Sequence, residues 1–239
     1  RVCAVKIYDF EVYVTDPEEK EQLIVWADEA GIEKMVGMPP ARFRPPNRLV
    51  AELIAGDDRF IGCCQVNPHF EDEAVAELEM CVTELGMRAL KLMPTYHGYP
   101  ATAPIIVPVM EKVRELGIPA NIHSGDYNAM PLQIAALAER FPDVPIIMDH
   151  MGYRLHTAEA VLAAEKCPNI YLGTTIATAE PIVIKRAADA VGAERVVFGS
   201  NAPGGIPVLC VEAIRRQDFT EEELELIFWR NLARIYGIQ

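Results

Sequence analysis

Short apolar runs rich in β-branched residues recur along the whole chain and predict buried strands. Their starts lie 24 to 32 residues apart, which leaves room in each unit for one strand, one helix and two short loops. The runs occupy residues 2–8 (continuing to 14), 34–38, 60–66, 88–93, 119–123, 145–150, 169–174 and 195–200. The pattern therefore predicts eight strands.

The segments between these runs carry helical signals. Asp16 offers an N-cap, Pro17 stands at the first helical position, and an acid follows at the third. Thr220 begins a second capping box, and the predicted helix behind it runs towards Tyr236. Four glycines stand shortly before a predicted strand, where they suit a helix end because glycine adopts the left-handed conformation cheaply: Gly31, Gly86, Gly117 and Gly192.

Strands that alternate with helices pair in parallel through right-handed crossovers. Eight such units without a long insertion predict an α/β fold, a single (β/α)8 TIM barrel. A doubly wound sheet is the alternative, but it usually carries a glycine-rich turn after its first strand, and residues 9–17 contain no glycine. No linker or shift in composition divides the chain, so we expect one domain over residues 1–239.

Composition narrows the classes of partner. The chain has 51% hydrophobic and 24% charged residues, the balance of a globular protein, and a formal net charge of −13. That charge disfavours nucleic acid and anionic membranes as partners and says nothing about small substrates. We expect a small-molecule substrate and a homo-oligomer. The six cysteines show no CxxC pair, and no apolar run approaches the ~18 residues of a membrane span. We expect free cysteines, with Cys63 and Cys64 packed as small hydrophobes, in a cytoplasmic protein.

Polar residues stand where several predicted strands end. In a barrel these ends form one mouth, and catalytic residues gather there. Side chains alternate along a strand, so Glu11 and Tyr13 should share a face. The polar residues at these ends are Glu11 and Tyr13 on the first strand, Lys91 on the fourth, His123 on the fifth, His150 on the sixth and Asn201 on the eighth.

Several of these units resemble the amidohydrolase-related family, the branch of the amidohydrolase superfamily with metal-dependent decarboxylases and lactonases. Residues 87–125 are similar to the fourth and fifth units of that family, and residues 139–152 (ERFPDVPIIMDHMG) to the sixth. Residues 192–203 (GAERVVFGSNAP) resemble the eighth unit, and NLARIYGI at 231–238 fits the closing helix. The resemblance covers nearly the whole chain.

The resemblance implies a metal site from which this chain departs. In that family the first strand ends Asp-x-His-x-His, with Glu for the first His in some decarboxylases; here Glu11 and Tyr13 stand at these places. His123 and His150 are kept, whereas the eighth-strand aspartate that serves as ligand and proton carrier is Asn201 here. Glu11, His123 and His150 are thus the candidate ligands of a zinc or manganese ion, which we expect to bind weakly. The alternative is that both histidines hydrogen-bond around a pocket without metal.

Further candidates concern substrate and proton transfer. Lys91 could bind a substrate carboxylate or balance Glu11 as a structural pair; a carboxylated, metal-bridging lysine is a third, less favoured option. Tyr96 and His97, in the loop after the fourth strand, and Arg154, past the sixth, are candidate substrate contacts. Asp126 is either a base or a solvated loop residue, and the second is favoured.

The resemblance implies a small-molecule hydrolase, which we expect to act on a lactone, amide or similar bond of a carboxylated substrate. His123 and His150 would position or activate water, and Glu11 would serve as ligand or base. Tyr13 and Asn201 would donate hydrogen bonds to developing charge. The first alternative is non-oxidative decarboxylation, to which Glu11 points. The alternative of another class is a non-catalytic binding barrel with a degenerate metal site.

Overall fold

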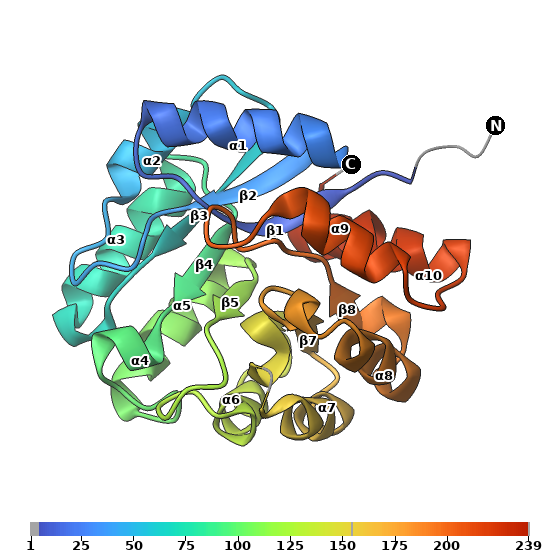
Figure 1. Cartoon of the computed structure of the whole chain (residues 1–239). Coiled ribbons are helices and arrows are strands. Elements are labelled where there is room, and N and C mark those ends of the chain that lie inside the picture. Colours follow the sequence, from blue (N-terminus) through green and yellow to red (C-terminus); the bar gives the residue numbers. More distant parts are fainter. Residues whose placement is uncertain (1–4, 154, 239) are drawn as a thin grey trace.

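A computed structural model describes residues 5–153 and 155–238 of the chain. Eight parallel strands stand in sequence order, each hydrogen-bonded to the next, and helices surround them as a ring (Figure 1). The strands are β1 (Tyr8–Tyr13), β2 (Lys34–Met38), β3 (Phe60–Gln65), β4 (Ala89–Leu92), β5 (Ala120–Ile122), β6 (Ile146–Met148), β7 (Ile170–Gly173) and β8 (Val196–Val197). The predicted (β/α)8 barrel is confirmed.

The ring of strands closes between β8 and β1. The Phe10 amide donates to the Phe198 carbonyl at 3.1 Å, and the Asn201 amide donates to the Glu11 carbonyl at 3.1 Å. The Tyr13 amide completes the seam with a 2.8 Å bond to the Ala202 carbonyl. The end of β1 is thereby tied to the loop after β8, which fixes the mouth of the barrel at that point.

Eleven α-helices occur among the described residues, most of them packed around the outside of the barrel. They are α1 (Pro17–Ala30), α2 (Asn47–Ile54), α3 (Asp72–Thr83), α4 (Pro94–His97), α5 (Val107–Leu116), α6 (Pro131–Ala138), α7 (Thr157–Lys166), α8 (Ile182–Val191), α9 (Pro207–Arg215), α10 (Glu221–Glu225) and α11 (Asn231–Tyr236). None of the helices in these two ranges is both long and apolar enough to cross a membrane.

The predicted helix signals lie where helices begin and end. The Asp16 carboxylate accepts from the Glu19 amide, and Thr220 forms a capping box with Glu223. Gly31 ends α1 at φ 72° and ψ 28°, the left-handed conformation that a side chain would disfavour. Gly192 ends α8 in a different way, at φ 91° and ψ 143°. That extended conformation also suits glycine, because positive φ strains other residues.

Two layers of apolar side chains fill the molecule. Between the strands and the outer helices lies the larger layer, and inside the barrel a smaller one packs Tyr8, Phe10 and their neighbours against α11. Tyr236 of α11 reaches Asn121 inside the barrel, whose amide nitrogen donates to the phenol oxygen at 3.0 Å. Helix α11 therefore covers the end where the strands begin and leaves the opposite end for polar groups.

Cys63 and Cys64 occupy opposite faces of β3. Cys63 lies inside the barrel and Cys64 lies against the outer helices, and both are fully buried. The five cysteines in the described part of the chain are free. Their packing as small hydrophobes is confirmed.

Candidate functional site

A β-bulge in β1 turns Glu11 into the barrel. The register of β1 against β2 shifts between Asp9 and Val12, where β1 has one residue more than its partner. Strict alternation would place Phe10 inside and Glu11 outside. Because of the bulge, both side chains lie inside, and Tyr13 follows on the same face. The Tyr13 hydroxyl donates to Glu11 Oε1 at 2.7 Å, as their predicted common face requires.

Lys91 forms the centre of a buried charged cluster with Glu11 and Asp149. Its Nζ lies 2.9 Å from Glu11 Oε1 and also donates to Asp149 Oδ2. All three side chains are completely inaccessible to solvent. The groups that bind Lys91 are therefore two carboxyl groups of the protein itself. This favours the structural-pair alternative for Lys91 over direct binding of a substrate carboxylate.

The pKa values of the cluster follow from burial and mutual charge. Burial raises the pKa of Glu11, but the Lys91 charge and the hydrogen bonds from Lys91 and Tyr13 outweigh it and hold that pKa at about 2. Burial and the Glu11 charge raise the pKa of Asp149 well above its ordinary value. Glu11 is thus the permanent anion of the cluster. Burial, reinforced by Glu11, also raises the pKa of the Tyr13 phenol, which stays a hydrogen-bond donor.

His150 is held by an unusual backbone conformation at the end of β6. Its φ is 61°, a left-handed value that is uncommon for a residue with a side chain. The turn ends the alternation of β6, so that Asp149 and His150 both face the mouth although they are neighbours in sequence. Thr175, just past β7, accepts from the His150 amide at 3.0 Å and contacts ring Nδ1 at 2.7 Å.

Two histidines link this buried region to the surface. His150 Nε2 lies 3.0 Å from His123 Nδ1, and His123 Nε2 lies 2.6 Å from Asp126 Oδ2. The side chain of His123 is 13% exposed, and that of Asp126 is 41% exposed. Asp126 is therefore a partner of His123 and not simply a solvated loop residue.

The direction of the hydrogen bonds follows from the Asp126 carboxylate, which can only accept. His123 Nε2 must carry a proton, so neutral His123 accepts at Nδ1, and His150 donates from Nε2. Neutral His150 then accepts at Nδ1 from the Thr175 hydroxyl. Burial lowers the pKa of His150 to about 3 and, with the Lys91 charge, lowers that of His123, while Asp126 opposes the shift of His123.

The remaining predicted residues lie to the side of this chain of hydrogen bonds. The Asn201 amide faces the loop after β8, where a Cβ on Gly204 would stand 2.8 Å from its Nδ2, and it lines a cavity of about 380 Å³. His97 is 4% exposed and bonds to the Arg42 carbonyl through Nε2 at 2.9 Å, so it ties two loops together. Tyr96 is 53% exposed, and its ring meets His97 edge to face. Arg154 lies outside the described residues.

Three groups missed as site residues in the sequence belong to the site: Asp149, Thr175 and Tyr153. The ring of Tyr153 lies 5.3 Å from that of His150 and 6.1 Å from that of His123, both edge to face. Asp149 directly precedes a predicted site histidine, which was the available signal. Tyr153 and Thr175 gave none, since their placement depends on turns after β6 and β7.

The cluster offers donor atoms of the type that a metal needs. Glu11, Asp149 and His150 each present a ligand atom, and these atoms lie within 4.8 Å of one another. Two carboxylates and an imidazole suit manganese or zinc by donor type. Asp149 takes the place that the predicted ligand set gave to His123, whose nitrogens contact His150 and Asp126.

The charge of Lys91 opposes a metal at these donors. Its ammonium already binds one oxygen of each carboxylate. Two unit charges 4 Å apart interact by about 4 kcal/mol at an effective dielectric constant of ~20, and a divalent ion beside an ammonium would be repelled roughly twice as strongly. The residues present therefore do not fit a tightly held divalent metal while Lys91 is charged.

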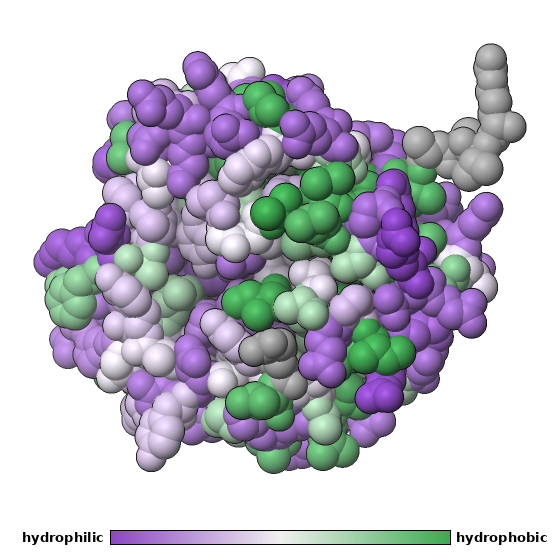
Figure 2. All heavy atoms as spheres, in the orientation of Figure 1, coloured by the Kyte–Doolittle hydropathy of each residue, from purple (hydrophilic) through white to green (hydrophobic). Residues whose placement is uncertain are grey.

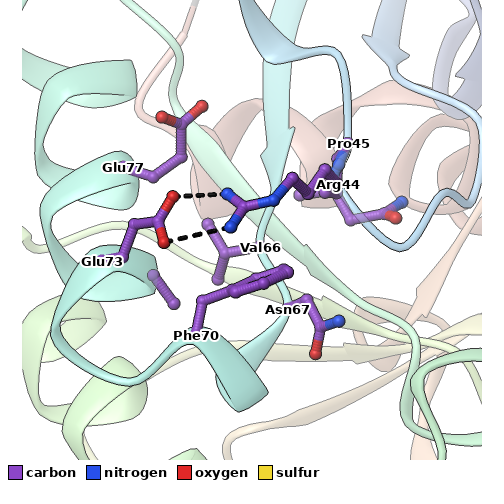
Figure 3. A pocket seen from close by; sticks show the side chains of 9 residues that line it. Arg44, Pro45, Val66, Asn67, Phe70, Glu73 and Glu77 are labelled. Atoms are coloured by element: carbon purple, nitrogen blue, oxygen red, sulfur yellow. Dashed lines mark hydrogen bonds and ion pairs between the residues drawn. The ribbon is translucent and has the colours of Figure 1, made fainter.

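A cavity of about 130 Å³ lies apart from this cluster, between the loop after β2 and helix α3 (Figure 3). Arg44 crosses it, forms a two-pronged ion pair with Glu73 and stacks 3.9 Å above the centre of the Phe70 ring. The guanidinium charge is thus neutralised within the cavity. The mouth of the barrel is the better candidate for a functional site.

Figure 2 shows polar side chains over the periphery of one face of the molecule and several hydrophobic ones nearer its middle.

The chain matches a known protein family and is similar to solved structures. A family model described as Amidohydrolase matches residues 11–238. No curated protein matches the sequence. An uncharacterised TIM-barrel protein from Bordetella bronchiseptica is similar in structure, with a TM-score of 0.84 at 20% identity over 97% of this chain and 98% of the other.

Two decarboxylases share the fold. The 5-carboxyvanillate decarboxylase from Sphingomonas paucimobilis aligns with a TM-score of 0.79 at 17% identity, over 99% of this chain and 100% of the other. The dihydroxybenzoic acid decarboxylase from Polaromonas sp. JS666, described with bound manganese and 2-nitroresorcinol, aligns with a TM-score of 0.74 at 19% identity, over 97% of each chain. At these identities the likeness shows the fold.

Proposed function

We propose that this chain, which belongs to the amidohydrolase family, is a non-oxidative decarboxylase of small hydroxylated aromatic carboxylic acids. This replaces hydrolysis as the main interpretation and takes up the alternative to which Glu11 pointed. Structures with the same fold that are named as decarboxylases support it.

The observation that carries the proposal is the chain of hydrogen bonds from Thr175 through His150 and His123 to Asp126. Decarboxylation of an aromatic acid needs a proton at the ring carbon that carries the carboxylate. His123 lies at the mouth, and its Nε2 is the nitrogen on the side of the half-exposed Asp126. In the proposed complex the substrate displaces Asp126 from this nitrogen, so that the N–H faces the ring carbon that carries the carboxylate.

The aromatic side chains at the mouth of the barrel indicate which class of substrate it would bind. The rings of His123 and His150 lie 4.7 Å apart, and Tyr153 meets both edge to face. Planar substrates pack well against such ring edges and faces. The buried cluster of Glu11, Lys91 and Asp149 lies deeper in the barrel than these rings. Its ion pairs hold Glu11 beside His150, and Glu11 in turn accepts a hydrogen bond from Tyr13.

The reaction then needs only proton transfer. Protonated His123 carries a proton on Nδ1 as well, so neutral His150 then holds its proton on Nδ1, towards Thr175, and accepts from His123 at Nε2. His123 gives its Nε2 proton to the ring carbon, and a C–H bond forms with an electron pair of the ring. The bond from that carbon to the carboxylate breaks, its electrons return to the ring, and carbon dioxide leaves. A substrate hydroxyl stabilises the protonated ring in between. Solvent returns the proton to His123 past Asp126. Asn201 is neutral and has no such proton to give.

A hydrolase is the second candidate, favoured by the lowered pKa values of both histidines. Burial keeps His150 and His123 neutral at pH 7, which suits a general base better than a general acid. In that case His123 would take a proton from water as the water attacks a lactone or amide carbonyl. The two candidates need opposite protonation states of the same residue.

The test is turnover of two panels, one of hydroxybenzoic acids and one of lactones and amides. Release of carbon dioxide is measured, and the products are analysed after reaction in D2O. Decarboxylation predicts one deuterium at the carbon that carried the carboxylate. Hydrolysis of lactones or amides without release of carbon dioxide would support the second candidate. Binding of the acids without turnover of either panel would support the non-catalytic barrel.

A further inference from the structure

Lys91 holds a position that is unusual for a lysine. It stands on the inward face of β4, with no exposed surface. Nζ contacts Glu11 Oε1 and Asp149 Oδ2 and lies 5.9 Å from the centre of the Tyr13 ring. A buried cation persists only where such partners compensate for its lost hydration.

The two carboxylates that bind this ammonium are also two of the three groups that could hold a metal ion. Glu11, Asp149 and His150 bring their donor atoms within 4.8 Å of one another. One oxygen of each carboxyl group contacts Lys91. The other oxygen of each, Glu11 Oε2 and Asp149 Oδ1, is buried and has no hydrogen-bond partner among the residues that the structure describes. The site is thus arranged for a cation, and a side chain of the protein supplies it.

The bonding of Lys91 also identifies its chemical form. A neutral amine would leave the buried Glu11 carboxylate without a compensating charge, so Lys91 is a charged ammonium. A carboxylated lysine would put a third negative group against Glu11 and Asp149, where like charges repel. This argues against the metal-bridging form of Lys91.

We propose that the Lys91 ammonium is the resident cation of this site and stands in the place of a divalent metal. The chain thereby departs from similar barrels described with bound manganese. The ammonium balances the Glu11 charge and also binds Asp149, so the pocket is assembled without loading of a metal. Removal of this one charge should turn the same carboxylates and His150 into a metal site. The inference holds for either candidate reaction, because it concerns the cation and not the chemical step.

The experiment compares the unmodified protein with Lys91→Met and with the matched control Lys34→Met. Lys34 begins β2 at the opposite end of the barrel, where its Nζ bonds to the Asp58 carbonyl at the surface. Each protein is saturated with Mn²⁺ or Zn²⁺, dialysed against metal-free buffer and analysed for metal per chain. Affinity is measured by titration calorimetry, and folding is followed by circular dichroism.

We expect Lys91→Met to retain about one metal per chain and to bind it at least about 100-fold more tightly than the other two proteins, which retain almost none. One tightly held metal in the unmodified protein would overturn the proposal. A folded Lys91→Met protein that binds no more tightly than the unmodified one would overturn it equally.

Loss of Lys91 leaves buried carboxylates unpaired, so Lys91→Met could unfold without metal. Folding that is restored by adding Mn²⁺ would support the proposal, because the metal then replaces the ammonium. Lys91→Gln serves as the second variant, since its amide keeps hydrogen-bond donors but no charge, and the same affinity criteria apply to it. If both variants stay unfolded in saturating Mn²⁺, a metal cannot replace the ammonium, and the proposal fails.

Discussion

His150 Nε2 and His123 Nδ1 lie 3.0 Å apart, with the two rings edge to face. One proton fits between these nitrogens, so the two imidazoles cannot both be charged without repulsion across this contact. A charge on His123 is instead balanced by Asp126, 2.6 Å from its other nitrogen. His123 is therefore the member of the pair that can change its protonation state, and His150 stays neutral.

Replacement of His123 should abolish most of the turnover. His123→Gln keeps a polar side chain but cannot carry an exchangeable imidazolium proton, and loss of a general acid costs about 10²- to 10⁴-fold in rate. We expect kcat for an acid that the protein decarboxylates to fall at least about 100-fold, with little change in the melting temperature. His69→Gln, an exposed histidine after β3, is the control and should lose less than about threefold. Equal losses in both variants would contradict the role of His123.

Asp126 should set the pH at which His123 is protonated. Its carboxylate raises the pKa of His123 against the lowering effects of burial and Lys91. Asp126→Asn removes that charge, so the pKa falls further and the rise of kcat/KM towards acid pH should move to lower pH. The control is Asp143→Asn, an exposed loop position. A profile that stays in place, or moves to higher pH, would show that Asp126 does not act on His123.

His97 should affect stability and not turnover, although its loop position made it a candidate substrate contact. Burial lowers the pKa of His97, so the folded protein favours the neutral ring. The stability that this provides is complete above the unfolded pKa near 6.5 and is lost as the pH falls below it, by up to about 1.4 kcal/mol per pH unit. His97→Gln keeps a donor for the Arg42 carbonyl and should flatten this dependence in urea unfolding at several pH values. A drop in kcat above tenfold would return His97 to the substrate site.

Gly173 gives room to the ring of Phe10 inside the barrel. A Cβ at Gly173 would stand 2.5 Å from the Phe10 ring, closer than real contacts allow. Gly173→Ala should therefore destabilise the protein by about 1–3 kcal/mol, measured by urea unfolding. Phe10→Leu in the same chain should recover part of the loss, since the ring is the obstacle. Additive effects of the two changes would mean that the two positions do not compete for space.

The order and spacing of the strands could be predicted from the sequence because each buried strand is a short apolar run between helical signals. Residues 34–38 are both the predicted and the observed extent of β2. Other strands are shorter than predicted, as β8 is, where 195–200 reduces to Val196–Val197. Phe198 and Ser200, beyond the observed end of β8, bond to Phe10 and Asp9 of β1. The assignment of residues 1–239 to one domain stays a prediction.

The site was predictable only as far as alternation holds. Lys91 faces inward because Ala89 does, two residues earlier on the same strand. The bulge that turns Glu11 inward and the left-handed turn at His150 both break that rule. Both depend on contacts with β2, β7 and β8 that are far away in sequence. For the same reason, the pairing of Lys91 with Asp149 could not be predicted.

The central claim is that protonated His123 delivers the proton to the ring carbon of the substrate. The pH dependence of kcat/KM for an acid that the protein decarboxylates tests this claim most directly. Because the pKa of His123 lies below 6.5, the reactive form is scarce at neutral pH. The account predicts that kcat/KM rises as the pH falls from about 8 towards this pKa, by up to about tenfold per pH unit, and that His123→Gln removes the rise. A rate that falls over the same range, or one that His123→Gln leaves unchanged in shape, would contradict it.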